Sequence, residues 1–251
     1  MLQKIMGQAR RAIDDFNMID DGDKIAIGLS GGKDSLTLLY ALYNLRRYYP
    51  KKFDIMAITI HPGSDTFKTD EMEKICKKLD VEYVVYNSNI SQVVFDIRKE
   101  KNPCSLCANM RRGMLNSVAI ENGCTKIALG HHNDDVIETF LMSVCLNGKI
   151  HTFAPVTYLS RSDVKVIRPF VYVSEKEIRA AARELNFPLP QKCCPMDGAS
   201  KREYMKDLIK DLSHDIPKLK ANLFGAIKRS NIQGWYNADN IENNNDIEKE
   251  E

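Results

Sequence analysis

Short apolar runs and longer amphipathic stretches alternate over the first 150 residues of the chain. The short runs predict strands at residues 24–29, 53–60, 82–86 and 126–129. Apolar residues at a helical spacing predict helices at residues 3–16, 34–47, 69–79, 108–121 and 134–146. Strands that alternate with helices are typical of an α/β fold, in which helices cover both faces of a parallel sheet. Ligands of such folds bind where the strands end, which here means residues 30–35, 61–66 and 130–135.

The pattern changes after residue 150. Residues 154–168 indicate two short strands around a polar turn. Ser174 and Glu177 form a capping box, which predicts a helix to about residue 185. A loop with prolines and cysteines follows, and two more helices begin near residues 200 and 217. We expect an α/β domain, a small C-terminal helical extension and a disordered acidic tail, at residues 1–170, 171–235 and 236–251.

The charge of the chain is unevenly distributed. Residues 239–251 contain six acids and one lysine, so the overall net charge of +2 leaves +7 on residues 1–238. A basic body suits a polyanionic partner. No apolar stretch approaches the length of a membrane span, and residues 1–16 lack the apolar centre of a signal peptide. Seven cysteines, an odd number, favour reduced thiols over a disulfide framework, so we expect a cytoplasmic protein.

Residues 30–35, Ser-Gly-Gly-Lys-Asp-Ser, carry the strongest chemical signal in the chain. They follow an apolar strand and begin a helix, and the two glycines let the backbone approach a ligand closely. Amides at a helix N-terminus bind phosphate, and the lysine and serines add a charge and two hydroxyl donors. The spacing matches neither the Walker loop nor the dinucleotide-binding glycine pattern. The alternative is an ordinary capping turn, but all six positions and the strand–turn–helix context favour a phosphate site.

Cys104 and Cys107 form a C-x-x-C pair just before a predicted helix. A helix N-terminus favours the thiolate form that binds metals. The pair alone is compatible with zinc, a redox dithiol or an iron–sulfur cluster. Zinc normally takes four ligands, and the chain has no second C-x-x-C pair. A third thiolate is available at Cys193 or Cys194, and three thiolates on a four-iron cluster leave one iron open.

Three motifs together resemble the tRNA 2-thiocytidine synthetase family of PP-loop ATP pyrophosphatases: Ser30–Ser35, Pro103–Cys107 with Arg111–Gly113, and Gly130–Asp135. Residues 12–19 and 167–169 are similar to that family as well, so the resemblance covers roughly residues 5–230. The family has a third cluster cysteine in its C-terminal part. We expect Cys194 in this role because a proline follows it, and Cys193 is the alternative.

The resemblance implies ATP-dependent tRNA thiolation with ATP, Mg²⁺ and a 4Fe-4S cluster as cofactors. An anticodon-loop cytidine leaves the base stack, its C2 oxygen is adenylated, and sulfur replaces it to give 2-thiocytidine. The expected catalytic residues are Lys33, Asp34, Arg111, Asp134 and Asp135. The expected nucleotide-binding residues are Ser30, Gly31, Gly32, Lys33, Asp34, Ser35, Ile60, Gly130 and His131. The expected cluster ligands are Cys104, Cys107 and Cys194.

Several of these residues also have structural alternatives. In the functional interpretation, Asp134 or Asp135 binds Mg²⁺ or orients the base. In the structural alternative, they cap the N-terminus of a helix. His131 is a phosphate or base contact, or a strand-end residue. Arg111 follows Cys107 by one helical turn and either holds the substrate or is solvated. A phosphate-tracking face is a further hypothesis for the basic residues of the last helices, Lys206, Lys210, Lys218, Lys220, Lys228 and Arg229.

The sequence is also compatible with other functions. They are thiolation of a tRNA uridine, another PP-loop reaction such as amidation, a non-catalytic ATP or iron–sulfur sensor, and a zinc-stabilised tRNA-binding protein. The expected partners are tRNA and a sulfur donor, either a cysteine desulfurase or sulfide, with no membrane. The sequence leaves the oligomeric state open, with a homodimer as one candidate.

Overall fold

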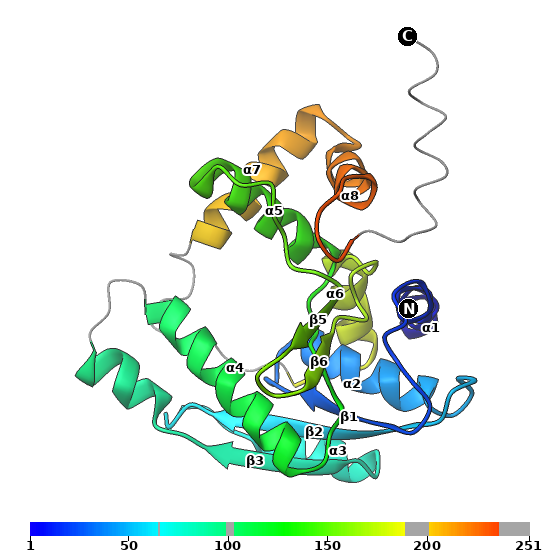
Figure 1. Ribbon diagram of the computed structural model, residues 1–251, viewed down its shortest axis with the longest axis vertical. Coiled ribbons are helices and arrows are strands. Elements are labelled where there is room, and N and C mark those ends of the chain that lie inside the picture. Colours follow the sequence, from blue (N-terminus) through cyan, green and yellow to red (C-terminus); the bar gives the residue numbers. More distant parts are fainter. Residues whose placement is uncertain (65, 99–102, 189–200, 236–251) are drawn as a thin grey trace.

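The computed structural model describes residues 1–64, 66–98, 103–188 and 201–235; the expected tail and Cys194 lie outside these ranges. Six strands form one sheet in the order β3-β2-β1-β4-β6-β5 (Figure 1). The strands are β1 (Asp23–Gly28), β2 (Phe53–His61), β3 (Glu82–Asn87), β4 (Lys126–Ala128), β5 (Val156–Leu159) and β6 (Val164–Ile167). All neighbours are parallel except β5 and β6, which form an antiparallel pair at one edge. The predicted parallel sheet is therefore confirmed.

The order of the strands changes direction at β1. Its two neighbours are β2, which is the next strand in the chain, and β4, which comes after β3 and three further helices. Ile27 of β1 pairs with Ala128 of β4, so the two strands end side by side. A crevice opens where connections leave two such strands in opposite directions, and this is where open α/β sheets bind ligands. The fold thus brings the segments after Gly28 and Ala128 together.

Helices cover both faces of the sheet, as expected. One face carries α1 (Leu2–Asp15), α2 (Lys33–Leu45), α3 (Asp70–Lys78) and α6 (Glu175–Glu184), and the other carries η1 (Gln92–Ile97) and α4 (Pro103–Glu121). Alternate residues of β1 separate into the two buried clusters: Ile25 and Ile27 belong to the first and Ala26 to the second. The near-continuous apolar strands follow from this double burial, because neither face of a parallel sheet is left to water.

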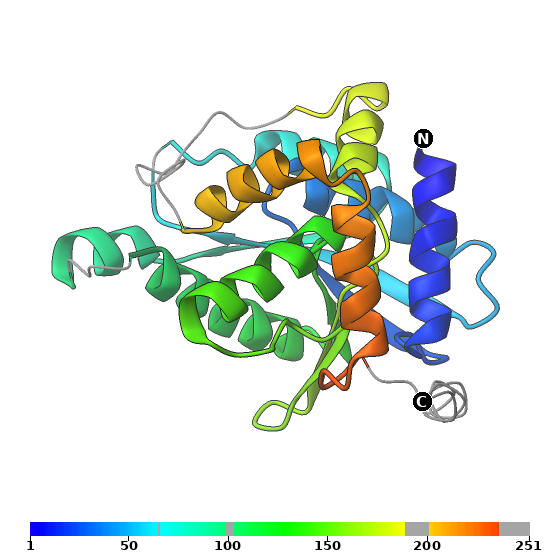
Figure 2. The same ribbon diagram turned by 90° about the horizontal axis from the view of Figure 1, so that it is seen from above.

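The C-terminal helices pack together rather than onto the sheet. Helices α7 (Lys201–Asp215) and α8 (Leu219–Arg229) lie against α5 (Asn133–Asn147), at the end of the molecule away from β3 (Figures 1 and 2). Trp235 follows these helices and is buried, and its indole Nε1 donates a hydrogen bond of 3.0 Å to the Phe153 carbonyl. None of the helices in the described ranges combines the length and apolar character that crossing a membrane requires.

Two local features differ from the sequence-based expectation. Helix α4 begins at Pro103, five residues before the expected start, so Cys104 and Cys107 lie within its first two turns. Proline fits the first turn of a helix because it has no N–H to pair there, which explains the early start. The π-helix η1 has no counterpart in the prediction. Its β-branched residues give no helical signal, and only its packing, with Val94 fully buried, fixes it.

Candidate functional site

A cleft of about 390 Å³ opens at the carboxyl ends of β1, β2 and β4. Its apolar lining comes from the strands, α4 and the β2–α3 loop: Leu29, Ile58, Ile60, Phe67, Leu115 and Leu129. Its polar lining comes from the loops and helices that follow: Ser30, Asp34, Ser35, Arg111, His131, Asp135 and Arg202. An apolar wall with a few converging polar groups is the usual form of a small-molecule site.

The loop at residues 30–35 is held in shape by its own serines. The Ser35 hydroxyl donates to the Gly32 carbonyl at 3.1 Å, and the Ser30 amide donates to Ser35 Oγ at 3.2 Å. Gly31 has a φ of +79°, a conformation that only glycine adopts without strain. Helix α2 begins directly after Gly32, and among the described residues no side chain caps its N-terminus. Its first amides are therefore available to an anion, as the phosphate-site interpretation requires.

The connection after β4 touches this loop closely. A Cβ atom on Gly130 would lie only 3.0 Å from the backbone carbonyl carbon of Asp34. Any side chain at this position would push the two segments apart, so a glycine is needed for the approach. Gly130 thus fixes the width of the cleft between the β1 and β4 connections.

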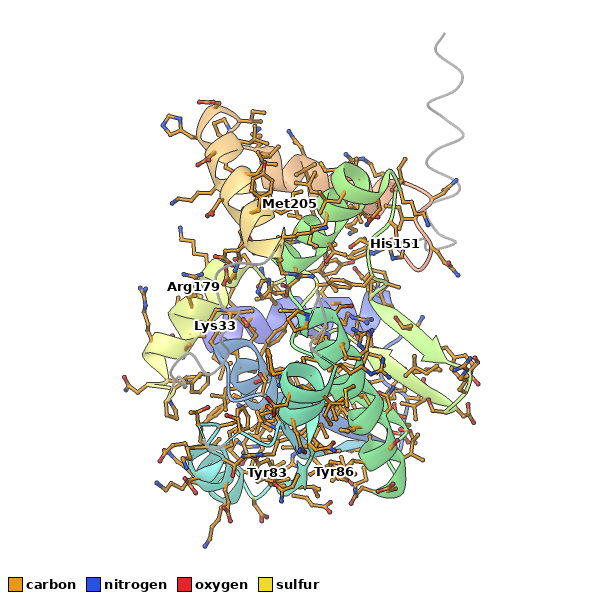
Figure 3. The ribbon with its side chains drawn as sticks, turned by 90° about the vertical axis from the view of Figure 1, so that its left-hand side faces the viewer. Lys33, Tyr83, Tyr86, His151, Arg179 and Met205 are labelled. Carbon is orange, nitrogen blue, oxygen red and sulfur yellow. The ribbon has the colours of Figure 1, made fainter. Side chains whose placement is uncertain are left out.

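Lys33 is turned towards α6 instead of lining the cleft. Its ammonium lies 3.0 Å from Asp34 and 3.1 Å from the carboxylate of Glu175, which also binds Arg179 at 2.9 Å (Figure 3). Burial disfavours the charged lysine, but the two carboxylates outweigh it and raise the pKa of Lys33. For Glu175, burial is outweighed by Arg179 and Lys33, which lower its pKa to about 2. Both groups are therefore charged at neutral pH.

The two histidines of the Gly130–Asp135 segment have different surroundings. Burial lowers the pKa of His131 to about 4, so its ring is neutral. His131 Nδ1 is buried and has no hydrogen-bond partner among the residues that the structure describes, and the ring lines the cleft. His132 is the N-cap of α5, where its Nδ1 accepts a hydrogen bond from the Asp135 amide at 3.4 Å. His131 is thus open to a ligand, whereas His132 has a structural contact.

The neighbouring aspartates point to different places. Asp134 accepts a hydrogen bond of 2.7 Å from the Glu175 amide and pairs with Lys220 of α8 at 2.6 Å, away from the cleft. Burial opposes the charge of Asp134, but these two contacts outweigh it and lower its pKa. Asp135 completes the capping box with His132 and also lines the cleft. The capping alternative thus describes Asp135, while Asp134 joins α5 to α6 and α8.

Behind Asp135 lies a second, more deeply buried carboxyl group. Glu138 is 2% exposed, and burial followed by the nearby Asp135 charge raises its pKa to about 7. Arg202, from the first turn of α7, contacts both: Nη1 lies 3.1 Å from Asp135 and 3.5 Å from Glu138. Its Nη2 donates to the Thr139 hydroxyl at 3.1 Å. Arg202 therefore binds α7 to α5 at the wall of the cleft.

The cysteine pair lies next to the cleft. Cys104 is exposed and Cys107 is half-buried, and the spacing of three residues places both on one face of α4. Arg111 continues this face: its Nη2 lies 4.0 Å from Cys107 Sγ, and its side chain lines the cleft. Arg111 Nε is buried without a partner in the described part of the chain. Within that same part, no three His, Cys, Asp or Glu side chains form a set that could hold a metal ion.

Part of the expected basic face is turned inward. Lys206 binds Glu175 at 3.5 Å, Lys220 binds Asp134, and Lys228 packs over a tyrosine ring at 4.8 Å. The phosphate-tracking face therefore stays a prediction.

Comparison with known proteins bears directly on this arrangement. The family described as the PP-loop domain matches residues 2–190. The tRNA-cytidine(32) 2-sulfurtransferase of Geobacter metallireducens is 40% identical over 238 residues, which cover 92% of this chain and 90% of that protein. The protein of the same name from Syntrophotalea carbinolica is 37% identical, with coverage of 93% and 90%. The chain belongs to the tRNA-cytidine(32) 2-sulfurtransferase family.

A solved structure extends the comparison. The U34-tRNA thiolase NcsA from Methanococcus maripaludis, determined with its [4Fe-4S] cluster, superposes with a TM-score of 0.72 at 27% identity. The match covers 88% of this chain and 76% of that one. The two proteins therefore share their fold over most of this chain.

Sequence reasoning missed three residues of this family member's site. Glu175 holds the PP-loop lysine, and Arg202 and Phe67 line the cleft. Glu175 lies within the predicted capping box, which indicated the start of a helix but not the contact with Lys33. Of the expected residues, Ser30, Asp34, Ser35, Ile60, Arg111, Gly130, His131 and Asp135 meet in the cleft.

Proposed function

We propose that this protein is an ATP-dependent tRNA sulfurtransferase that converts an anticodon-loop cytidine to 2-thiocytidine. The observation that carries the proposal is the position of Arg111, which lines the cleft with Ser30 and Asp34 and lies 4.0 Å from Cys107 Sγ. The nucleotide-binding loop and the thiol pair thus share one site. Cytidine is favoured over uridine because the relatives named for cytidine are 37–40% identical, against 27% for the U34 thiolase.

In the first step, the C2 oxygen of cytidine attacks the α-phosphorus of ATP. The bond to the bridging oxygen breaks and pyrophosphate leaves. The amides of the PP-loop and of the α2 N-terminus hold the phosphates, and Lys33 exchanges Glu175 for a phosphate oxygen. Among the described residues, Asp34 and Asp135 are the carboxylates that line the cleft. They suit Mg²⁺, which needs only one or two carboxylates beside the phosphates.

In the second step, the sulfur of a hydrosulfide attacks C2, the bond from C2 to the adenylated oxygen breaks, and AMP leaves. A four-iron cluster held by Cys104, Cys107 and Cys194 would supply this sulfur. The two described cysteines fit such a group, because their thiols lie one turn apart on one helix face beside the cleft. Neutral His131 contacts the base, and the proton that the sulfur loses passes to water. The Arg111 guanidinium holds the phosphate of the leaving AMP.

The test is mass spectrometry of nucleosides from tRNA incubated anaerobically with the cluster-loaded protein, ATP, Mg²⁺ and sulfide. We expect 2-thiocytidine that depends on ATP. Cys107→Ser should abolish it, whereas Cys145→Ser should not, since Cys145 is an exposed cysteine on α5 outside the site. Formation of thiouridine instead of thiocytidine would show that the substrate is a uridine, while the ATP-dependent thiolation itself would stand. The proposal fails if protein that holds its cluster and binds ATP forms no thionucleoside.

A further inference from the structure

Arg202 lines the ATP cleft although it comes from a helix outside the PP-loop sheet. It and Arg111 are the two cationic side chains among the described residues that line the cleft. Lys33 does not line the cleft in this structure, because it is turned towards Asp34 and Glu175. A nucleotide triphosphate brings several negative charges into this space, and these need cationic partners.

The guanidinium of Arg202 is held in a fixed orientation. Three groups of α5 contact it: the carboxylates of Asp135 and Glu138 through Nη1, and the Thr139 hydroxyl through Nη2. An arginine fixed in this way loses little further conformational entropy when it binds a ligand. Its Nε–H and one Nη2–H have no acceptor in the part of the chain that the structure describes. These free donors belong to a side chain that is 41% exposed and lines the cleft.

We propose that Arg202 binds the phosphate chain of ATP and is a substrate-binding residue of this enzyme. The inference rests on the proposed function, because it assigns the nucleotide to this cleft. Its consequence is that α7 completes the ATP site. Helix α7 begins directly after residues 189–200, which include the expected third cysteine.

The first test measures ATP binding by calorimetry on the anaerobic, cluster-loaded protein. We expect Arg202→Ala to raise the Kd for ATP about tenfold, since charge-assisted hydrogen bonds to phosphate are lost. The matched control is Arg183→Ala, which removes the same side chain and charge from an exposed position near the C-terminal end of α6. The control should bind ATP as the unmodified protein does. Equal Kd values for the two variants would overturn the proposal.

A second measurement separates phosphate binding from a merely structural role. Arg202 also attaches α7 to α5, so its loss can disturb the cleft as a whole. We therefore compare ATP, AMP and adenosine in competition with a fluorescent ATP analogue. Phosphate binding predicts that Arg202→Ala weakens ATP and AMP and leaves adenosine unchanged. Equal weakening of all three ligands would show that Arg202 only supports the fold. Arg202→Lys should restore part of the ATP affinity, because it keeps the charge without the planar fork.

The third measurement distinguishes the two sources of phosphate. Binding of tRNA without ATP should change no more in Arg202→Ala than in the Arg183→Ala control. A variant that loses tRNA affinity but keeps ATP affinity would assign Arg202 to the tRNA backbone and overturn the proposal. If the unmodified protein itself does not bind ATP, the proposed function fails; if it binds ATP and the arginine variant binds equally well, only this inference fails.

Discussion

Glu175 competes with ATP for the ammonium of Lys33. In the structure, Lys33 lies between the carboxylates of Asp34 and Glu175, at 3.0 and 3.1 Å. The pKa of Glu175 is lowered to about 2, so its charge is present at every pH at which the enzyme would be assayed. Phosphates at the PP-loop must attract Lys33 away from one of these carboxylates. We therefore expect Glu175→Gln to bind ATP more tightly than the unmodified protein.

The magnitude follows from the geometry. Two unit charges 3.1 Å apart attract each other by roughly 5 kcal/mol at an effective dielectric constant of about 20. The net effect is smaller, because Asp34 still binds Lys33 in the variant and both partners are partly exposed, with 21% and 14% of their side chains accessible. We expect a gain of about 1–2 kcal/mol. This corresponds to a Kd for ATP that is roughly 5- to 30-fold lower.

The assay is calorimetric titration of ATP into the two proteins at low and high salt. The gain should shrink at high salt, since the pair is only partly shielded from solvent. Glu184→Gln is the matched control, because it removes the same charge from the exposed C-terminal end of α6 and should leave the Kd unchanged. A higher Kd in Glu175→Gln would refute the reasoning. It would mean that Glu175 orients Lys33 for the phosphates instead of withholding it.

Three further predictions address the surroundings of the cleft. A Gly130→Ala methyl carbon would lie 3.0 Å from the Asp34 carbonyl carbon, so we expect about tenfold weaker ATP binding with an unchanged circular dichroism spectrum; unchanged affinity would contradict the close approach. The pKa of Glu138 is about 7 in the folded protein, against 4.5 for the free side chain. The stability that its neutral form contributes is therefore fully present below pH 4.5 and is lost as the pH rises through 7. Urea unfolding should therefore show that the unmodified protein loses about 2–3 kcal/mol relative to Glu138→Gln between pH 5 and pH 8, and parallel profiles would exclude this. Lys126 is 2% exposed and binds the buried Asp23 at 2.6 Å, so Lys126→Met should lower the free energy of unfolding by about 3–5 kcal/mol; a loss below about 1 kcal/mol in chemical denaturation would show that Asp23 is not left unpaired.

The sequence by itself determined the features that depend on neighbouring residues. The strand–turn–helix at Ser30–Ser35 follows from an apolar run, two glycines and an apolar helical period, all within about twenty residues. The capping box of Ser174 and Glu177 forms as expected, with Ser174 Oγ donating to the Glu177 carboxylate at 2.7 Å. Local patterns of this kind carry their own geometry, because backbone periods are the same in every protein.

Only the tertiary structure decided which charged groups meet. Asp134 and Asp135 are adjacent in the sequence, and their directions differ by about 100° around a helix. Which of them faces the cleft depends on where α6, α7 and α8 pack. As a result, Asp134 pairs with Lys220, whereas Asp135 lines the cleft and pairs with Arg202. Long-range partners of this kind follow from the packing of whole elements, whose positions no single segment encodes. The sequence therefore identified the chemistry of the site, and the packing of the C-terminal helices assigned its individual charges.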